Sequence, residues 1–331
     1  MAQPAVADNP VVVRGLRKQY GNATAVNGLD MDIRTGEVFC LLGPNGAGKT
    51  TTVEILEGLR NRSDGEVRVL GHDPAGHPRG WRARIGVVPQ TTGAFADLTV
   101  REVVAQFAAF YPDPLPVDEV IDMVGLTAAR KKQSMALSGG QRRRLDVAVG
   151  IVGDPELIFL DEPTTGLDPV ARREAWEVVR FFARRGRTTI LTTHYLDEAE
   201  VLSDRVGIIA GGRMIETGPP AEIGGRSHTP ARVCFTKSGP LAGLPLPSLP
   251  QDTAIEVAGG AAAGGPGQFN EVRLGTKKPT AIMDVLLPWA HAAGVDEIPD
   301  VRIYRPTLEE TYLDLIRRHS PDKNGTERAL S

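Results

Sequence analysis

The sequence predicts an α/β fold that carries a helical insertion and ends in a smaller α+β domain. Residues 11–220 alternate between short apolar runs typical of buried strands and stretches typical of helices. Between two of these strands the pattern changes to helices alone, which predicts a helical subdomain over about 91–155. From about residue 219 the composition shifts toward Gly, Pro, Ala and Ser. We therefore expect a main domain over 11–220 and an accessory α+β domain over 221–318.

The main domain contains four apolar runs that are typical of strands buried on both faces. Such runs are continuous rather than alternating, because helices cover both sides of a parallel sheet. A hairpin that turns at Gly211 and Gly212 is expected after them. The strands and the hairpin are "EVFCLLG" (37–43), "RIGVVPQ" (84–90), "LIFLDE" (157–162), "TTILTTH" (188–194) and "RVGIIAGGRMIETG" (205–218).

Helices dominate the insertion, and the accessory domain mixes strands with helices. Insert helices are predicted at "LTVREVVAQFAAFY", at "VDEVIDMVGL" and after "LSGGQ". The accessory domain is predicted to hold strands at "ARVCFTK", "AIEVAGG", "NEVRLGT" and "DVRIYR", with helices at "PTAIMDVLLPWAHAAG" and "TLEETYLDLIRR". Residues 1–10 and the tail 319–331 are predicted to be disordered, and the Gly-rich stretch 259–267 is predicted to be a flexible loop within the accessory domain.

Composition and charge narrow the function classes. The chain has 331 residues, of which 41% are hydrophobic and 24% charged, as in a soluble globular protein. The net charge of −3 argues against a broad nucleic-acid-binding surface. No stretch reaches the roughly 18 uninterrupted apolar residues of a membrane span, so work at a membrane would need another chain to cross it. The two cysteines predict no disulfide framework, which fits a reducing cytoplasm.

The strongest motif is a phosphate-binding loop, "GPNGAGKTT", between a predicted strand and a predicted helix. Its glycines let the backbone curl so that N–H groups point at phosphate oxygens. Lys49 would neutralise the β- and γ-phosphates, and the Thr50 hydroxyl would bind Mg²⁺. A glycine-rich turn without a ligand is the alternative, and the flanking strand and helix argue against it. The predicted nucleotide-binding residues of the loop are Gly43, Pro44, Asn45, Gly46, Ala47, Gly48, Lys49, Thr50 and Thr51.

Two carboxylates end the predicted strand "LIFLDE", about 110 residues after the loop. Asp161 would hold Mg²⁺, through a water molecule. Glu162 points to the other side of the strand and would act as the base for the water that attacks the γ-phosphate. Taken alone, the pair could simply cap the following turn, but together with the phosphate loop it indicates a nucleotide hydrolase.

Three further polar or aromatic residues are candidates for the same site. His194 ends the strand that follows the one bearing Glu162, at the carboxyl edge of the sheet where ligands gather in such folds, and would contact the γ-phosphate. Gln90 ends another strand at this edge and would contact Mg²⁺ or the attacking water. Tyr20 could stack on the base of the nucleotide. A structural histidine, a polar strand end and an edge aromatic are the respective alternatives.

A second candidate phosphate cradle stands at residues 137–144, "LSGGQRRR". A serine hydroxyl, two glycines and the start of a helix offer exposed N–H groups and the positive end of a helix dipole. The residues concerned are Ser138, Gly139, Gly140 and Gln141. One nucleotide does not need two cradles so far apart in the chain. The arginines after Gln141 are equally well explained as a solvated helix face.

The motifs together resemble those of ABC-transporter ATPase subunits, which have the P-loop NTPase fold. "GPNGAGKTT", "VVPQ", "LSGGQRRR", "LIFLDEPTTGLDP" and "LTTHYLDEAE" stand in the order and spacing of that family, over about residues 10–220. The chain looks like the drug-resistance exporter branch in particular, which includes daunorubicin-resistance ATPases. Its "RPTLEETYLDL" is similar to the "PSLEDVFL" ending common there.

The resemblance implies ATP and Mg²⁺ as ligands and a homodimer with ATP at its interface. In this family two subunits pack head to tail, so Ser138 and Gly140 of one subunit would face the γ-phosphate held by Lys49 of the other. The same packing would place Asp168 at the dimer seam. This arrangement would explain why the chain has two phosphate cradles.

The resemblance also implies a separate transmembrane permease, which would hold the chain at the cytoplasmic face of the plasma membrane as a peripheral subunit. The permease would contact the helical insertion near Gln90, Ala94, Phe95 and Leu98. No nucleic-acid partner is expected. An ATPase of the same fold that acts on ribosomes or DNA, and an importer ATPase, are the alternatives. The transported compound is not encoded here, because specificity would belong to the permease.

Overall fold

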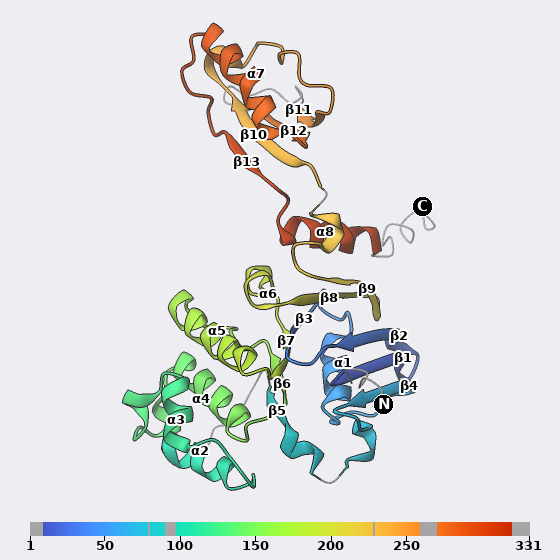
Figure 1. Ribbon diagram of the computed structural model, residues 1–331, viewed down its shortest axis with the longest axis vertical. Coiled ribbons are helices and arrows are strands. Elements are labelled where there is room, and N and C mark those ends of the chain that lie inside the picture. The colour runs from blue at the N-terminus through green and yellow to red at the C-terminus, as the bar shows by residue number, and fades with distance from the viewer. Residues whose placement is uncertain (1–8, 79, 90–96, 228, 259–269, 320–331) are drawn as a thin grey trace, which may run out of the picture. The chain divides into compact units, whose positions relative to one another are not determined.

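The structure is a computed structural model that describes residues 9–78, 80–89, 97–227, 229–258 and 270–319. Contacts divide the chain into two compact units, both shown in Figure 1. Unit 1 runs to Ile223 and includes the end of the chain from Tyr312, and unit 2 comprises Gly224–Thr311. The segments predicted to be disordered, 1–10 and 319–331, lie almost wholly outside the described residues, and so does the predicted flexible loop 259–267.

Unit 1 is built around a six-stranded sheet with the strand order β5-β6-β7-β3-β8-β9. Five of the strands are parallel, and β9 is the antiparallel edge partner of β8. All four predicted buried strands and the hairpin are present, so this part of the prediction is confirmed. Their bounds are β3 Val38–Leu42, β5 Ile85–Val88, β6 Leu157–Asp161, β7 Thr188–Thr192, β8 Arg205–Ala210 and β9 Arg213–Gly218.

A three-stranded antiparallel sheet, which the sequence analysis did not predict, shares a hydrophobic core with the first sheet. It comprises β1 (Val11–Tyr20), β2 (Ala23–Ile33) and β4 (Asp64–Val69). Irregular pairing interrupts both ladders of β1, so its alternation of apolar and polar residues is broken. A strict two-residue period is the usual signal for a half-buried strand, and here bulges erase it.

The helices of unit 1 cover the parallel sheet and form the insertion. The predicted helical insertion is confirmed: α2, α3 and α4 follow β5, precede β6 and pack on one another. They gather as a separate group in Figure 1. The bounds in unit 1 are α1 Lys49–Leu56, α2 Val100–Ala108, α3 Val117–Met123, α4 Gly139–Ile151, α5 Pro169–Arg184 and α6 Leu196–Leu202.

Unit 2 is an antiparallel sheet with the order β11-β12-β10-β13 and a helix, α7, packed on β10. Phe235 from β10 and Leu286 from α7 are buried in its own hydrophobic core. The predicted strands and helices of this region are present. Their bounds are β10 Ala231–Lys237, β11 Ala254–Ala258, β12 Asn270–Thr276, α7 Pro279–Ala292 and β13 Arg302–Tyr304, and α8 (Leu308–His319) ends the described chain. Among the described residues, no helix combines the length and the apolar character that a bilayer span requires.

Candidate functional site

The phosphate loop joins β3 to α1, and two of its glycines are required by close backbone contacts. A Cβ atom at Gly43 would lie 2.4 Å from the carbonyl oxygen of Ile209, and one at Gly48 would lie 2.4 Å from that of Ala25. Gly48 also has a φ of 102°, a region that side chains rarely adopt. No other residue fits these positions without moving the backbone, so the loop can curl only with glycine there.

Lys49 begins α1 and lies along the loop that precedes it. Its Nζ donates to the carbonyl oxygens of Gly43 at 2.6 Å and Pro44 at 3.2 Å. Burial lowers the pKa of the ammonium, and the negative charges of Glu162 and Asp161 partly oppose that shift. The positive charge of the loop and the carboxylates at the end of β6 therefore share one site.

Asp161 is the last residue of β6, and a threonine of the neighbouring strand fixes its carboxylate. The register of the parallel pair places Thr192 opposite Asp161. The Thr192 hydroxyl donates to Asp161 Oδ1. One carboxylate oxygen is thus engaged within the sheet, which holds the orientation of the other.

Glu162 has an unusual backbone conformation that two neighbouring contacts hold in place. Its φ is 47°, in the left-handed region, which is uncommon for a residue other than glycine and is often found at functional sites. Its backbone N–H is shared between the carbonyl oxygen and the hydroxyl of Thr192, both at 3.1 Å. Its Oε2 accepts a hydrogen bond from the Thr165 hydroxyl at 3.1 Å.

His194 lies beside Glu162, just after the end of β7. Its Nδ1 is 3.5 Å from Glu162 Oε2, and 49% of its side chain is exposed. Its ring is 4.0 Å from the ring of Tyr195, measured between centroids. The guanidinium of Arg172, on α5, lies 3.9 Å from the centre of the Tyr195 ring. The predicted grouping of Lys49, Asp161, Glu162 and His194 is therefore present at one edge of the sheet.

These residues fit a magnesium–nucleotide complex better than a free metal ion. Among the described residues, no group of three or more His, Cys, Asp and Glu side chains could hold a metal by itself. Mg²⁺ typically takes one or two carboxylates and completes its shell with water and substrate phosphates. The Asp161 carboxylate and the exposed Thr50 hydroxyl, next to the phosphate loop, are donors of that kind.

Ser138 is the N-cap of α4, and the second cradle faces outward. Ser138 and Gln141 form a capping box, in which Ser138 N–H donates to Gln141 Oε1 at 3.2 Å and Gln141 N–H donates to Ser138 Oγ at 3.3 Å. Ser138 and Gly139 are exposed. The Ser138 hydroxyl accepts from Gln141, whereas Lys49 Nζ donates to carbonyl oxygens of its own loop. Each cradle is thus held by contacts of its own.

Asp168 has a structural role that the sequence analysis did not foresee. It is the N-cap of α5, and its Oδ1 accepts from the backbone N–H groups of Val170 at 2.9 Å and Ala171 at 3.0 Å. The hydrogen bond from Ala171, followed by that from Val170, lowers the pKa of the carboxyl. Asp168 is exposed, so a capping role leaves one face of the residue open to other contacts.

Of the two remaining candidate residues at the predicted site, the structure describes Tyr20 but not Gln90. Tyr20 ends β1 and is 41% exposed. Lys18 Nζ lies 5.0 Å from the centre of its ring, and the Arg60 guanidinium lies 5.4 Å from it. Gln90, proposed for Mg²⁺, is outside the described residues, as are Ala94 and Phe95.

Sequence reasoning missed two side chains that the structure places at the site. Thr192 stands in a largely apolar strand, and its signal was a hydroxyl at the residue that ends β7. Arg143 was left open between a function and a solvated helix face, yet only 7% of it is exposed. Its signal was the helical period, because it stands four residues before the buried Val147. The solvated-face interpretation is therefore wrong for Arg143.

The fold and the phosphate loop define a P-loop ATPase, and comparisons with known proteins give its family. A family model described as ABC transporter matches residues 26–165. The chain is 35% identical over 323 residues to a daunorubicin resistance ATP-binding protein of Streptomyces coeruleorubidus, across 94% of this chain and 96% of that protein. It is 41% identical over 226 residues to Nod factor export ATP-binding protein I of Ralstonia nicotianae, across 66% and 70% of the two chains.

Solved structures give the same result. An ATP-binding subunit of an ABC transporter has a TM-score of 0.59 and 25% identity to the chain, over 64% of this chain and 91% of that one. The chain therefore belongs to the family of ABC-transporter ATP-binding proteins. Its activity is the binding and hydrolysis of ATP in transport. The predicted fold class and the resemblance stated above are both confirmed.

Glu57, at the end of α1, is expected to make the stability of the folded state depend on pH. It is 6% exposed, and burial, followed by the charges of Asp161 and Glu54, raises its pKa to about 8. Because the folded pKa lies above the unfolded one, the folded state binds more protons between about pH 4.5 and 8. Stability is highest below the unfolded pKa and falls as the pH rises toward 8.

We expect Glu57→Gln to remove this loss, since Gln keeps the shape of the protonated acid. At pH 8 the variant should be more stable than the parent by up to about 4 kcal/mol, and near pH 4.5 the two should agree. The free energy of unfolding measured by urea at both pH values checks this. Glu66→Gln, at a largely exposed carboxylate on β4, is the control. Equal pH dependence in parent and Glu57→Gln would contradict the prediction.

Proposed function

We propose that this chain is the ATPase subunit of an exporter of drugs or natural products. The observation that supports the proposal is the extent of the likeness to the Streptomyces daunorubicin resistance protein, which covers 94% of the chain and so includes unit 2. The Ralstonia relative is also named for export. In this proposal residues 11–220 form the ATPase domain and residues 221–318 an accessory domain.

The phosphate loop and the carboxylates at the end of β6 would bind MgATP. Residues 43–51 would surround the phosphates, with Lys49 opposite their charge, and Tyr20 would stack on the adenine. Thr50, Asp161 and Gln90 would hold Mg²⁺, which, when bound, would neutralise charge that develops on the phosphate oxygens. The glycines that cannot carry a Cβ and the exposed Thr50 support this assignment.

Glu162 would act as the general base for the attacking water, and His194 would contact the γ-phosphate. Glu162 Oε2 has two neighbours, the Thr165 hydroxyl at 3.1 Å and His194 Nδ1 at 3.5 Å. A carboxylate that is held by its neighbours can orient water and accept its proton without first reorganising. The left-handed backbone at Glu162 supports a functional assignment, since such strain is often found at active sites.

Two subunits would form a homodimer with ATP at the interface. Ser138, Gly139, Gly140 and Gln141 of one subunit would face the γ-phosphate bound by the other, and Asp168 would lie at the seam. The exposure of Ser138 at the start of α4 supports this, because an exposed helix start can be presented to the nucleotide of another subunit.

A separate permease would carry the chain at the cytoplasmic face of the plasma membrane, as a peripheral subunit that binds no nucleic acid. The permease would contact the insertion near Gln90, Ala94, Phe95 and Leu98. An ATPase that acts on ribosomes or DNA, or one that serves an importer, would carry the same ATP site. Unit 2 is the part of the chain whose likeness to a drug-resistance protein favours the exporter.

Co-expression tests the exporter role. We expect the chain to co-purify in detergent with the membrane protein encoded beside its gene, and a panel of hydrophobic drugs that includes daunorubicin to contain compounds that stimulate the ATPase rate of the complex. The same complex with Lys49→Ala should assemble and stay inactive. Co-purification with ribosomes or with an importer's substrate-binding protein in place of an exporter would contradict the proposal.

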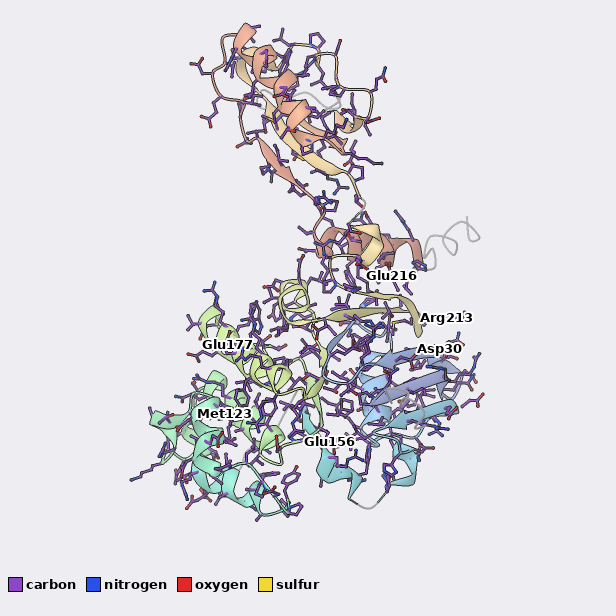
Figure 2. All side chains as sticks on the ribbon, in the orientation of Figure 1. Asp30, Met123, Glu156, Glu177, Arg213 and Glu216 are labelled. Atoms are coloured by element: carbon purple, nitrogen blue, oxygen red, sulfur yellow. The ribbon has the colours of Figure 1, made fainter. Side chains whose placement is uncertain are left out.

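Glu162→Gln tests the assignment of the base. Gln keeps the shape and removes the carboxylate, so hydrolysis should fall by roughly 10²-fold or more while ATP stays bound. The variant should then accumulate as an ATP-bound dimer, which light scattering after gel filtration would detect. Glu177→Gln, at an exposed carboxylate on α5 (Figure 2), is the control and should hydrolyse ATP at the parent rate. Parent-like hydrolysis by Glu162→Gln would sink the assignment.

Mixing two inactive variants tests whether the ATP site is shared between subunits. Ser138→Arg should bind ATP yet fail to close the dimer, because the added charge would meet Lys49 across the seam. In a mixed dimer with Lys49→Ala, both defects fall on one composite site and the other site is intact. We expect ATPase activity to return on mixing. If each defect acted within its own chain, mixing would restore nothing.

A further inference from the structure

Arg143 is a buried cation of unit 1, and its guanidinium donates hydrogen bonds to several backbone carbonyls. The residue lies on α4, and 7% of it is exposed. Its Nε donates to Pro163 O at 3.0 Å, its Nη1 to Pro89 O, and its Nη2 to Asp161 O at 2.7 Å and Glu162 O at 3.1 Å. The three nitrogens of one guanidinium thus hold four carbonyl oxygens.

These carbonyls belong to the point where the pairing of β5 and β6 stops. The last matched residues of that ladder are Val88 and Leu160. Beyond them, buried carbonyl groups need donors from elsewhere, and the guanidinium supplies them to both strand ends. Arg143 therefore fastens the residue after β5, the last residue of β6 and the two residues that follow β6 to α4.

The Arg143 side chain is placed to bind several backbone carbonyls rather than to form one ion pair. The carboxylate oxygen Asp146 Oδ2 is 3.9 Å from Arg143 Nη1, which is longer than a hydrogen bond. A buried charge is costly to desolvate, and a planar fork of donors can reach several acceptors that a lysine ammonium cannot. An arginine is needed at this position because its guanidinium can donate to several carbonyl oxygens at once.

Glu162 lies between two anchors as a result. Its backbone N–H is bound by Thr192 from β7, and its carbonyl oxygen is bound by Arg143 from α4. With a φ of 47°, the residue would relax toward commoner backbone angles if one anchor were removed. Such a relaxation would carry the Glu162 carboxylate away from Thr165 and His194.

We propose that Arg143 is a positioning residue for ATP hydrolysis, which clamps the backbone of residues 161–163 to α4 and thereby holds the Glu162 carboxylate in its reactive place. The inference rests on the proposed role of Glu162 as the base. In this role Arg143 acts on the backbone that carries Glu162 and not on the nucleotide or the water. Its effect should therefore appear in turnover and not in the affinity for ATP.

The first test compares Arg143→Gln with Arg142→Gln. Arg142 is the matched control, because it is exposed on the same helix and its hydrogen bond, to Met135 O, is 3.4 Å long. We expect Arg143→Gln to lower kcat by about 10- to 100-fold, as a small misplacement of a reacting group does. The dissociation constant for ATP should stay within about 2-fold of the parent value. Arg142→Gln should match the parent in both.

The second test asks whether Arg143 acts through Glu162. In the Glu162→Gln background the clamp has no carboxylate to position, so Arg143→Gln should lower the residual rate no further than about 2-fold. A merely structural role would lower it again and would weaken ATP binding as well. Should Arg143→Gln fail to fold, Arg143→Lys keeps the charge but not the fork, and it should show the same fall in kcat with ATP affinity retained.

Three outcomes would overturn the proposal. The first is a parent-like kcat in Arg143→Gln, or in Arg143→Lys where the Gln variant does not fold. The second is a loss of ATP affinity that matches the loss of kcat. The third is a further fall of the ATPase rate when Arg143→Gln is added to Glu162→Gln. Failure of the underlying assignment is distinguishable, because Glu162→Gln is measured in the same assay. If Glu162→Gln hydrolyses ATP at the parent rate, the assignment of Glu162 as the base is wrong, and the proposed role of Arg143 is wrong with it. If Glu162→Gln is slow while Arg143→Gln keeps the parent rate, only the proposed role of Arg143 is wrong.

Discussion

The register between β6 and β7 is the constraint on which the candidate site depends. It sets Thr192 opposite Asp161. From there the Thr192 hydroxyl donates to the Asp161 carboxylate and also accepts from the N–H of Glu162. A shift of one residue would turn the side chains of one strand to the opposite face of the sheet, and the Asp161 carboxylate and the Glu162 backbone N–H would lose this common partner. The pairing of β6 with β7 therefore fixes the positions of Asp161 and Glu162 before any ligand binds.

Charged groups buried around this edge connect the elements that carry the site. Glu198, on α6, has no exposed surface, and it accepts from the Thr164 hydroxyl at 3.2 Å and from Trp176 Nε1 at 3.0 Å. Burial raises its pKa, and these hydrogen bonds oppose the shift. Because a buried polar group is costly unless it is satisfied, each contact restricts where α5 and α6 can sit. Arg143 does the same for α4. The rigidity of the edge thus comes from polar groups at the borders of an apolar core.

Much of the fold could be predicted because the parallel strands are continuous apolar runs. "VFCLL" and "LIFL" admit few other structures when a glycine loop or a pair of carboxylates follows them. The antiparallel sheet was missed because bulges in β1 disturb its alternation. The hairpin of β8 and β9 was predicted despite a similar irregularity, since two adjacent glycines marked its turn. Glycines still mark a turn when a bulge interrupts the neighbouring strands, whereas a bulge breaks the alternation of apolar and polar residues.

The site was predictable only in part, for a related reason. Lys49, Asp161 and Glu162 stand in motifs with a fixed spacing, so their chemistry can be inferred without coordinates. The partners that hold them, Thr192 and Arg143, come from elements 30 residues downstream and 19 residues upstream of Glu162. No local pattern reveals which backbone carbonyl a distant guanidinium will reach. For Asp168 the sequence analysis named the residue but missed one of its roles. It was assigned to the dimer seam, and the structure shows that it is also the N-cap of α5.

The separation of the two phosphate cradles follows from the way each is built. The first is made of backbone that could not accept a Cβ at Gly43 or Gly48, and it is joined through Lys49 to its own loop. The second is an exposed helix start whose serine and glutamine already satisfy each other's backbone groups. A helix start that is capped internally stays folded without a ligand, so it can be presented to a separate molecule. Since α4 also carries Arg143, the same rigid helix joins that exposed start to the backbone of Glu162.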